Sequence, residues 1–167
     1  PTGYLQKNNY DANGFIASVT GSHSDSFIFE TLWQADAYDA VGRVLSESLG
    51  NGVRNFNDYN QYSGHLLETC SKVQSVEANH ADSKACDSAT YIHHQSYEYD
   101  LADNLTTKVD HINDRELHHR FDELGRLYLV YHKNSFKTDV FKYDAIGNFE
   151  KRSDFGTYRY SQDPNSS

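Results

Sequence analysis

The stretches RFDELGRLYLVY (residues 120–131) and FKYDAIGNFE (residues 141–150) share one motif, which begins at Phe121 and again 22 residues later at Tyr143. The motif is an aromatic residue, an aspartate, two variable residues and a glycine. It occurs five times, and the third copy has Asp103 in the glycine position. The copies contain Tyr10, Asp11 and Gly14; Tyr38, Asp39 and Gly42; Tyr99 and Asp100; Phe121, Asp122 and Gly125; and Tyr143, Asp144 and Gly147.

A sixth, looser copy runs from Tyr59 to Leu66, and its Gly64 comes one residue later than in the other copies. The six copies start at residues 10, 38, 59, 99, 121 and 143, so the steps are 28, 21, 40, 22 and 22 residues. Steps near 22 residues indicate one supersecondary unit repeated in tandem. The step of 28 predicts an insertion, which we place at residues 21–26, and the step of 40 is close to two units.

The residue types of the motif predict a β-hairpin. The aromatic residue ends a strand, because its neighbours favour extended backbone. The aspartate opens the turn, where its carboxylate accepts hydrogen bonds from backbone N–H groups two or more residues on. The glycine occupies a position of positive φ, as in a type I turn followed by a left-handed residue. Between the motifs, residues 49–52 and 111–114 fit a second turn, so the sequence predicts an all-β fold of antiparallel β-hairpin repeats.

We expect residues 1–160 to form the repetitive sheet, with an irregular insertion at about 70–90 and a disordered tail at 161–167. Residues 70–89 are small and polar and lack apolar alternation, which favours a long loop with a short helical turn at 76–80. Cys70 and Cys86 flank this loop. Two cysteines do not make a disulfide scaffold, so both a local loop-closing bridge and two free thiols stay open.

Bulk properties exclude some classes of function. The net charge is −9 and the isoelectric point is about 5.3, which argues against nucleic-acid binding, since that needs clustered Lys and Arg. No stretch approaches the roughly 18 apolar residues of a membrane-spanning helix.

No catalytic, cofactor-binding or metal-binding residues are predicted. The chain has nine histidines, but the adjacent pairs His93–His94 and His118–His119 point to opposite faces of a strand. The motif aspartates recur at one turn position, whereas a catalytic pair occurs once. Neither a nucleophile elbow nor a glycine-rich phosphate loop is present. Arg43 and Arg126, which follow the motif glycine, could bind an acidic ligand, or else pair with a carboxylate or stack on an aromatic ring.

The repeat resembles the RHS/YD-repeat family, through AYDAVGRVLSESLGNG (37–52), YEYDLADNLTTKVD (97–110), RFDELGRLYLVYHKN (120–134) and FKYDAIGNFEKRSDFGTYRY (141–160). The family includes bacterial Rhs proteins, BC components of insecticidal Tc toxins, and animal teneurins. The resemblance implies a continuous curved, spiralling sheet that forms a segment of a hollow shell. In bacterial members the shell encloses a C-terminal toxin, and in teneurins a similar barrel is an adhesion scaffold.

The resemblance implies a structural, non-enzymatic segment of a secreted or cell-surface bacterial protein. Its partners would be the remainder of the shell and the enclosed toxin. A full shell takes far more than six repeats, and the DPxGL-type segment that ends the shell by self-cleavage is absent from this sequence, so we interpret the chain as a fragment and assign it no self-cleavage.

Two further hypotheses belong to other classes. Exposed tyrosines and Trp33 could stack on sugar rings, which would make the chain a carbohydrate-binding or cell-adhesion module with a glycan or cell-surface receptor as its partner. The competing interpretation of these rings is packing between repeats. A hydrolase would need a pair of carboxylates outside the repeated turns. Open sheet edges also predict self-association of the isolated chain.

Overall fold

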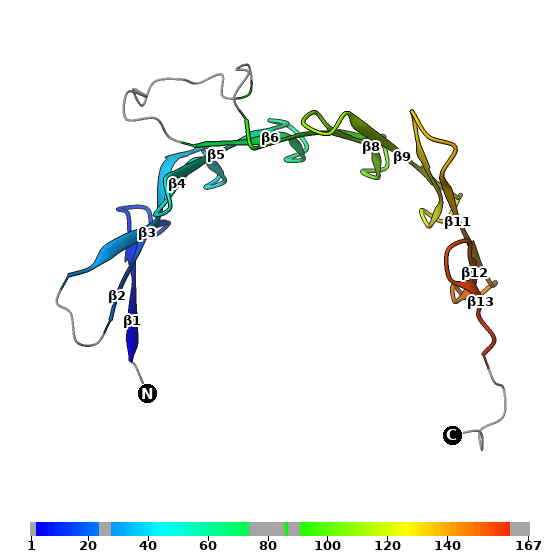
Figure 1. Ribbon diagram of the computed structural model, residues 1–167, viewed down its shortest axis with the longest axis horizontal. Helices are drawn as coiled ribbons and strands as arrows, with labels where there is room; N and C mark the ends of the chain where they lie inside the picture. The colour runs from blue at the N-terminus through cyan, green and yellow to red at the C-terminus, as the bar shows by residue number, and fades with distance from the viewer. Residues whose placement is uncertain (1–2, 24–27, 74–85, 87–90, 161–167) are drawn as a thin grey trace. The chain divides into compact units, whose positions relative to one another are not determined.

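The computed structural model describes residues 3–23, 28–73, 86 and 91–160, and in these residues the chain is entirely β-strand, turn and irregular backbone (Figure 1). The predicted all-β fold is therefore confirmed. Each motif aromatic is the last residue of its strand. The strands are β1 (Tyr4–Tyr10), β2 (Ile16–His23), β3 (Glu30–Tyr38), β4 (Val44–Leu49), β5 (Val53–Tyr59), β6 (Leu66–Val73), β7 (His93–Tyr99), β8 (Leu105–Asp110), β9 (Arg115–Phe121), β10 (Leu127–His132), β11 (Thr138–Tyr143), β12 (Phe149–Arg152) and β13 (Gly156–Thr157).

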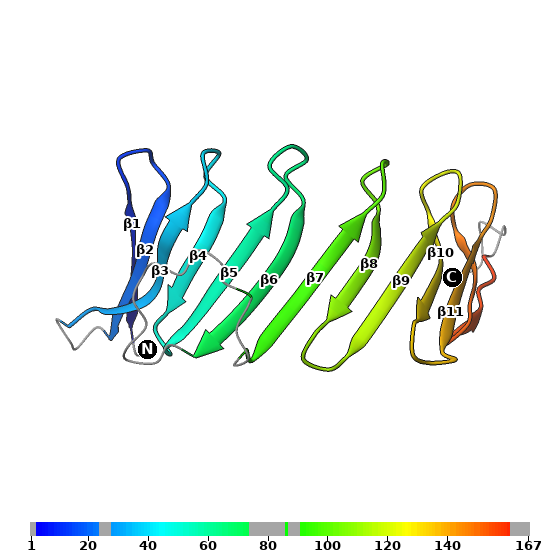
Figure 2. The same cartoon turned by 90° about the horizontal axis from the view of Figure 1, so that it is seen from above.

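The strands form an antiparallel meander. Each strand is hydrogen-bonded to the strand before it and the strand after it in the sequence, so the order runs from β1 to β13 (Figure 2). This is the simplest sheet that consecutive hairpins can build. The first and last strands, β1 and β13, each have one neighbour among the described residues. Among the described residues, β1 and β13 therefore each have one edge with no strand paired to it.

The chain divides into two compact units, Pro1–Ser96 and Tyr97–Ser167. Unit 1 contains strands β1 to β6 and most of β7, and unit 2 contains the end of β7 and strands β8 to β13. Both units are built from the same hairpins. The contacts described below lie within one unit or the other.

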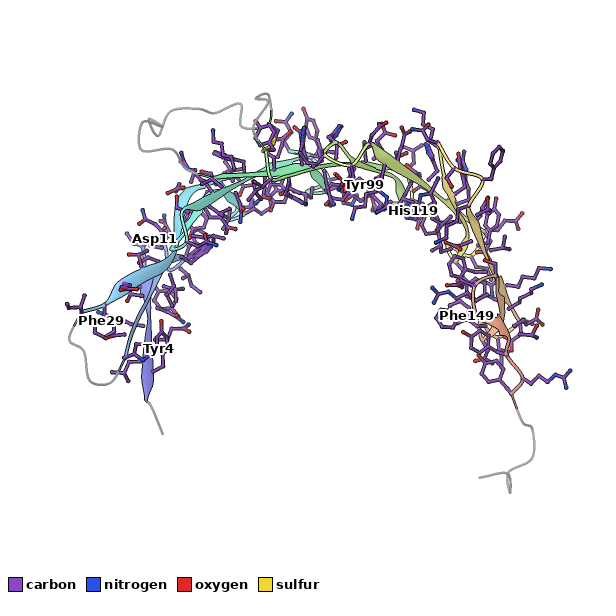
Figure 3. All side chains as sticks on the ribbon, viewed as in Figure 1. Tyr4, Asp11, Phe29, Tyr99, His119 and Phe149 are labelled. Atoms are coloured by element: carbon purple, nitrogen blue, oxygen red, sulfur yellow. A yellow bond between two sulfur atoms is a disulfide. The ribbon has the colours of Figure 1, made fainter. Side chains whose placement is uncertain are left out.

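Within each unit the sheet is a single layer, and side chains project from both of its faces (Figure 3). Among the described residues, Phe56 and Cys70 alone are buried hydrophobic residues. Many large apolar side chains stay exposed, including Tyr62 at 89% and Ile146 at 86%. Domains normally bury a sheet face against a second layer. Cross-strand pairs therefore have to stabilise this sheet in place of a shared core.

Two segments expected to be irregular begin as regular strand. Gly21, assigned to an insertion, lies in β2 and pairs with Gln6 of β1, while residues 24–27 lie outside the described part. Cys70 to Val73, assigned to the irregular segment, lie in β6 and pair with residues 53–56 of β5. Ladder partners on the neighbouring strand thus outweigh the polar composition that suggested a loop.

Other expectations fall outside the described residues. These are the helical turn at 76–80 and the disordered tail at 161–167. The two alternatives for the cysteines are resolved, because Cys70 and Cys86 form a disulfide.

Candidate functional site

The motif turn recurs along the chain, and its backbone hydrogen bonds are nearly the same in the five regular copies. In the fourth copy the Asp122 N–H donates to the carbonyl of Arg126 at 2.9 Å, and the Gly125 N–H donates to the carbonyl of Asp122 at 2.9 Å. Gly125 has a φ of 73°, and Asp103 reaches 65° in the copy that lacks glycine. The same two hydrogen bonds close the turns at Asp11, Asp39, Asp100 and Asp144.

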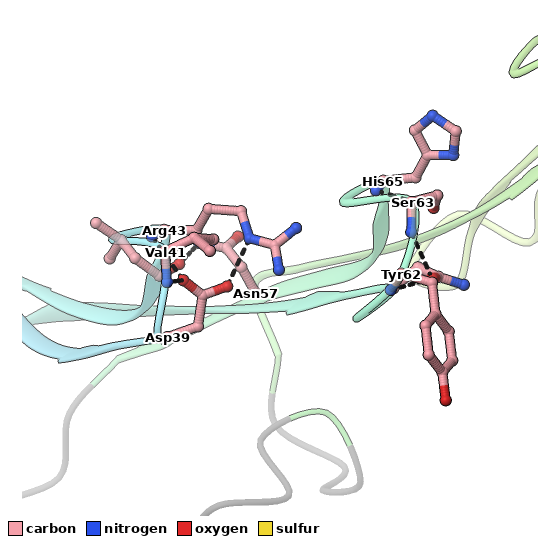
Figure 4. Close-up of polar contacts among 9 residues, drawn as sticks. Asp39, Val41, Arg43, Asn57, Tyr62, Ser63 and His65 are labelled. Atoms are coloured by element: carbon pink, nitrogen blue, oxygen red, sulfur yellow. Dashed lines mark hydrogen bonds and ion pairs between the residues drawn. The ribbon is translucent and has the colours of Figure 1, made fainter.

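One carboxylate oxygen of the motif aspartate organises the backbone of the turn. Oδ1 of Asp39 accepts hydrogen bonds from the N–H groups of Val41, at 3.0 Å, and Arg43, at 2.9 Å (Figure 4). The N–H groups of the second and fourth residues beyond Asp11, Asp100, Asp122 and Asp144 donate to their aspartate in the same way. A carboxylate is suited to this position because it accepts several hydrogen bonds and donates none.

The other carboxylate oxygen binds the side chain that follows the glycine. Nε of Arg43 lies 2.5 Å from Oδ2 of Asp39, and Nε of Arg126 lies 2.8 Å from Oδ2 of Asp122. In two other copies an asparagine takes this place, with Nδ2 of Asn104 at 3.1 Å from Asp100. In the last copy Nδ2 of Asn148 lies 2.9 Å from Oδ2 of Asp144. Sequence reasoning did not identify the two asparagines, although their position after the turn was a usable signal.

These hydrogen bonds lower the pKa of four motif carboxyls, those of Asp39, Asp100, Asp122 and Asp144. At Asp100 and Asp144 the leading cause is the hydrogen bond from the following asparagine side chain. At Asp122 it is the Arg126 backbone N–H. At Asp39 partial burial, which raises the pKa, is outweighed by the backbone and side-chain hydrogen bonds from Arg43. The four carboxyls are thus held in the charged form, which suits a cap and not a general acid.

In three copies the residue that follows the glycine also contacts the aromatic residue of the next copy. Cζ of Arg43 lies 4.8 Å from the centroid of the Tyr59 ring, and Cζ of Arg126 lies 4.8 Å from that of Tyr143. In the first copy Phe15 holds this place, with its ring centroid 5.6 Å from that of Tyr38. The predicted alternative of carboxylate pairing and aromatic stacking therefore holds for both Arg43 and Arg126, each of which makes both contacts.

The motif tyrosine returns a hydrogen bond to the preceding copy. The Tyr143 hydroxyl donates to the carbonyl of Leu127 at 2.8 Å, and the Tyr38 hydroxyl donates to the carbonyl of Ile16. Each acceptor lies two residues after a motif glycine. Burial, followed by the charge of Asp11, raises the pKa of Tyr38. Each of these tyrosines therefore links two successive hairpins.

The looser copy at Tyr59 keeps the same plan with one more residue. Asn60 replaces the aspartate, and its Oδ1 accepts hydrogen bonds from the N–H groups of Tyr62, at 2.9 Å, and Ser63, at 3.0 Å (Figure 4). Gly64 has a φ of 80°. The extra residue lengthens the turn, and the side-chain cap shifts from the fourth residue to the third.

Two open depressions lie beside motif turns, one in each unit. The depression in unit 1 has a volume of about 610 Å³ and is lined by residues that include Asp11, Asp36 and Asp39. The depression in unit 2 has a volume of about 570 Å³ and is lined by residues that include Asp122 and Arg126. The motif carboxylates in both depressions accept hydrogen bonds from the backbone N–H groups of their own turns.

A buried ion pair in unit 1 joins three strands, and sequence reasoning missed it. Nε of Arg54 lies 2.9 Å from Oδ2 of Asp36, and the two side chains are 5% and 7% exposed. The Ser48 hydroxyl donates to the same oxygen at 2.7 Å. Asp36 sits at an irregularity in the β3–β4 register, between Ala35 and Ala37. Nothing in the local sequence distinguishes it from the solvated aspartates.

The histidine pairs behave as strand residues. Nε2 of His118 lies 2.9 Å from Oε1 of Glu116, and its ring stacks on Tyr131 with centroids 4.7 Å apart. Burial lowers the pKa of the neighbouring His119. In unit 1, Nε2 of His94 lies 2.6 Å from Oε1 of Glu68.

Trp33, proposed as a sugar-stacking residue, is half-buried. Its indole N–H donates to Glu47 at 2.6 Å. A part of the ring edge is therefore already committed within the sheet.

No protein-family model matches the sequence, and no curated protein matches it. Among the described residues no helix is long and apolar enough to cross a membrane. Solved structures do match. A Photorhabdus luminescens Tc holotoxin pore superposes with a TM-score of 0.70 at 18% identity, over 90% of this chain and 8% of the other.

Two crystal structures of TcdB2–TccC3 give similar results. One superposes with a TM-score of 0.70 at 17% identity, over 90% of this chain and 8% of the other. The second, which lacks the hypervariable C-terminal region, has a TM-score of 0.69 at 17% identity, over 94% and 8%. This chain thus spans about 8% of the length of the chains it matches. The likeness confirms the predicted resemblance at the level of fold: the chain folds as a segment of a Tc-toxin chain does.

Proposed function

We propose that the chain is a structural segment of a secreted RHS/YD-repeat shell, and that the shell encloses a C-terminal toxin. The observation that carries this proposal is the repeated contact between successive hairpins. Each motif aspartate caps its own turn, and in three copies the residue after the glycine packs on the aromatic residue of the next copy. Such a unit specifies its neighbour on both sides and can be extended without limit, as a wall requires.

The single-layer sheet supports the same proposal. A free-standing sheet that buries only Phe56 and Cys70 among the described hydrophobic residues is poorly protected on both faces. In a closed wall, one face meets solvent and the other meets the enclosed space. The fold likeness to a Tc holotoxin pore adds support.

We assign the segment no catalysis of its own. Its most regular polar groups are the motif carboxylates, which repeat from copy to copy, and the turn holds those of Asp39, Asp100, Asp122 and Asp144 in the charged form. Its partners in this proposal are the rest of the shell and the enclosed toxin. The disulfide fits an oxidising, extracytoplasmic setting of the kind that a secreted bacterial protein meets.

Electron microscopy of the complete natural gene product tests this proposal. We expect the chain to lie in the wall of a closed hollow body, with strands paired to both β1 and β13. We also expect a C-terminal region that resists protease until the wall is unfolded. A sheet with both faces in bulk solvent, and no enclosed region, would contradict the proposal.

A second candidate function, sugar binding, is favoured by the exposed aromatic rings of Tyr62, at 89%, and Phe136, at 108%. They lie in different units, Tyr62 in the motif turn between β5 and β6 and Phe136 in the turn between β10 and β11. Calorimetric titration with a panel of glycans would detect such binding, and Tyr62→Ala would then abolish it. Absence of heat with every glycan would leave the wall proposal unaffected and remove this candidate.

A further inference from the structure

The disulfide joins the most deeply buried residue of unit 1 to a residue outside the strands. Cys70 lies in β6, is 0% exposed, and faces Phe56 of β5 on one side and His94 of β7 on the other. Cys86 is half-buried. The two cysteines are separated by 16 residues. The bridge thus fixes a distant point of the chain against one face of the sheet.

The face that carries Cys70 also carries the buried cluster of unit 1, which we call the Phe56 cluster and which comprises Asp36, Arg54, Phe56, Cys70 and Lys72. Phe56 is 5% exposed. Cζ of Arg54 lies 5.1 Å from the ring centroid of Phe56, and Nζ of Lys72 lies 5.0 Å from it. Arg54 is in turn held by Asp36. A single-layer sheet does not by itself bury side chains to this extent.

The two sulfur atoms therefore differ in their access to a reductant. A thiolate that reduces the bridge must reach one sulfur along the S–S axis. Cys70 is fully buried and Cys86 is half-buried, so attack is expected at the sulfur of Cys86. The first step then forms a bond between the reductant sulfur and Cys86 and breaks the bond to Cys70, which leaves as a thiolate.

The second step completes the reduction. The reductant's other thiol attacks the mixed disulfide, which releases Cys86 and leaves the reductant oxidised as a disulfide. The protein gains two electrons and two protons. The first step is the slow one, because the leaving Cys70 thiolate appears at a fully buried position and is deprived of hydration there. A poor leaving group slows the exchange.

We infer that the Cys70–Cys86 disulfide is a permanent clamp of unit 1: it must form in an oxidising compartment, and while the Phe56 cluster is folded it resists reduction. The inference concerns unit 1 by itself and does not rest on the proposed shell. It distinguishes a structural bridge from a redox switch, whose disulfide would be reduced readily in the folded chain.

The test is reduction of the intact chain by dithiothreitol, with the released thiols alkylated and counted by mass spectrometry at successive times. We expect reduction to be at least about 100-fold slower in the folded chain than in urea, because the Cys70 thiolate has to leave into a fully buried position. Equal rates with and without urea would overturn the inference, as would a purified, air-oxidised chain that contains two free thiols.

A second measurement locates the first attack. Brief exposure to glutathione followed by acid quenching traps the mixed disulfide, and we expect the glutathione on Cys86. A mixed disulfide on Cys70 would contradict the proposed asymmetry.

Variants test the role of the cluster. Phe56→Ala should speed reduction of the folded chain toward the rate in urea, and the milder Phe56→Leu should speed it less while keeping the fold. Phe141→Ala, which alters a half-buried ring in unit 2, is the matched control and should leave the rate unchanged. A rate that responds equally to Phe56→Leu and Phe141→Ala would overturn the role assigned to the cluster.

Discussion

Two arginine–aspartate pairs, one in each compact unit, have similar distances and very different surroundings. Arg54 and Asp36 of unit 1 meet at 2.9 Å with side chains 5% and 7% exposed. Arg126 and Asp122 of unit 2 meet at 2.8 Å with side chains 28% and 26% exposed. The first pair connects three strands, whereas the second lies within one turn. The same kind of ion pair therefore has two roles: the first is part of a buried cluster between strands, and the second stabilises a repeated turn.

The difference shows how the chain combines a repeated element with a unique one. The motif turn recurs in both units and sets the hairpins. The Phe56 cluster occurs in unit 1, and no second cluster with a buried hydrophobic residue exists among the described residues of unit 2. We therefore expect substitutions in the cluster to cost far more than equivalent substitutions in a turn.

The largest effect is expected from Arg54→Met. The substitution removes the partner of a buried carboxylate, and breaking a buried pair in this way costs about 3–5 kcal/mol. Hydrogen exchange of peptides from strands β3 to β5 would report the loss in unit 1 directly. Arg126→Met is the matched control in unit 2, where loss of a partly exposed pair costs about 1 kcal/mol or less. Equal losses in the two units would break the comparison.

The next effect is expected from Gly125→Val. Gly125 has a φ of 73°, and an added Cβ would meet no atom within 4 Å, so the substitution isolates the cost of the backbone conformation. A β-branched residue there should destabilise unit 2 by more than about 1 kcal/mol. Gly125→Asn is the control, because asparagine tolerates this conformation better. Unchanged urea unfolding of the valine variant would show that the turn does not need its left-handed residue.

A smaller effect is expected from Tyr143→Phe. The substitution removes the hydrogen bond from the hydroxyl to the carbonyl of Leu127 but keeps the ring under Arg126. The expected loss is about 0.5–1.5 kcal/mol in unit 2. Tyr62→Phe, at an 89% exposed ring, is the control and should change nothing. If thermal unfolding of the two variants is the same, the hydroxyl does not contribute to the contact between hairpins.

The smallest effect is expected from acidification. The pKa values of Asp39, Asp100, Asp122 and Asp144 are lowered in the folded chain. Their contribution to stability is therefore complete above the ordinary aspartate pKa of 3.8 and is lost as the pH falls through the lower folded values. Urea midpoints measured from pH 6 to pH 2 should fall mainly below 3.8. Asp122→Asn lacks the charged carboxylate at every pH, so this variant should be less stable than the parent chain at neutral pH and should lose less stability on acidification. A urea midpoint that rises on acidification would contradict the lowered pKa values.

The turns were predictable from the sequence because their chemistry is local. Asp122 and Gly125 are three residues apart, and both residue types have strong backbone preferences. The ends of the strands at Tyr10, Tyr38 and Tyr143 follow from the same pattern. The contact of Arg126 with Tyr143 was predictable only as one of several alternatives, since it depends on how successive hairpins align.

The Phe56 cluster was not predictable in the same way. Asp36 and Arg54 are 18 residues apart and belong to strands that are not neighbours, so no local pattern joins them. The pairing of Cys70 with Cys86 could not be decided from the sequence for a similar reason, because sequence spacing permits a disulfide without requiring one. Repeated, local features can be inferred from the sequence, whereas unique, long-range features require the structure.

The most direct test of the central claim, that this chain is one segment of a longer wall, is amide hydrogen exchange in strand β1. In the chain alone, the β1 amides that do not face β2 have no strand beside them and should exchange within seconds. In the complete natural gene product we expect the same amides to be protected as strongly as those of β5, because another strand pairs with β1. Equally rapid exchange of these amides in both proteins would contradict the account.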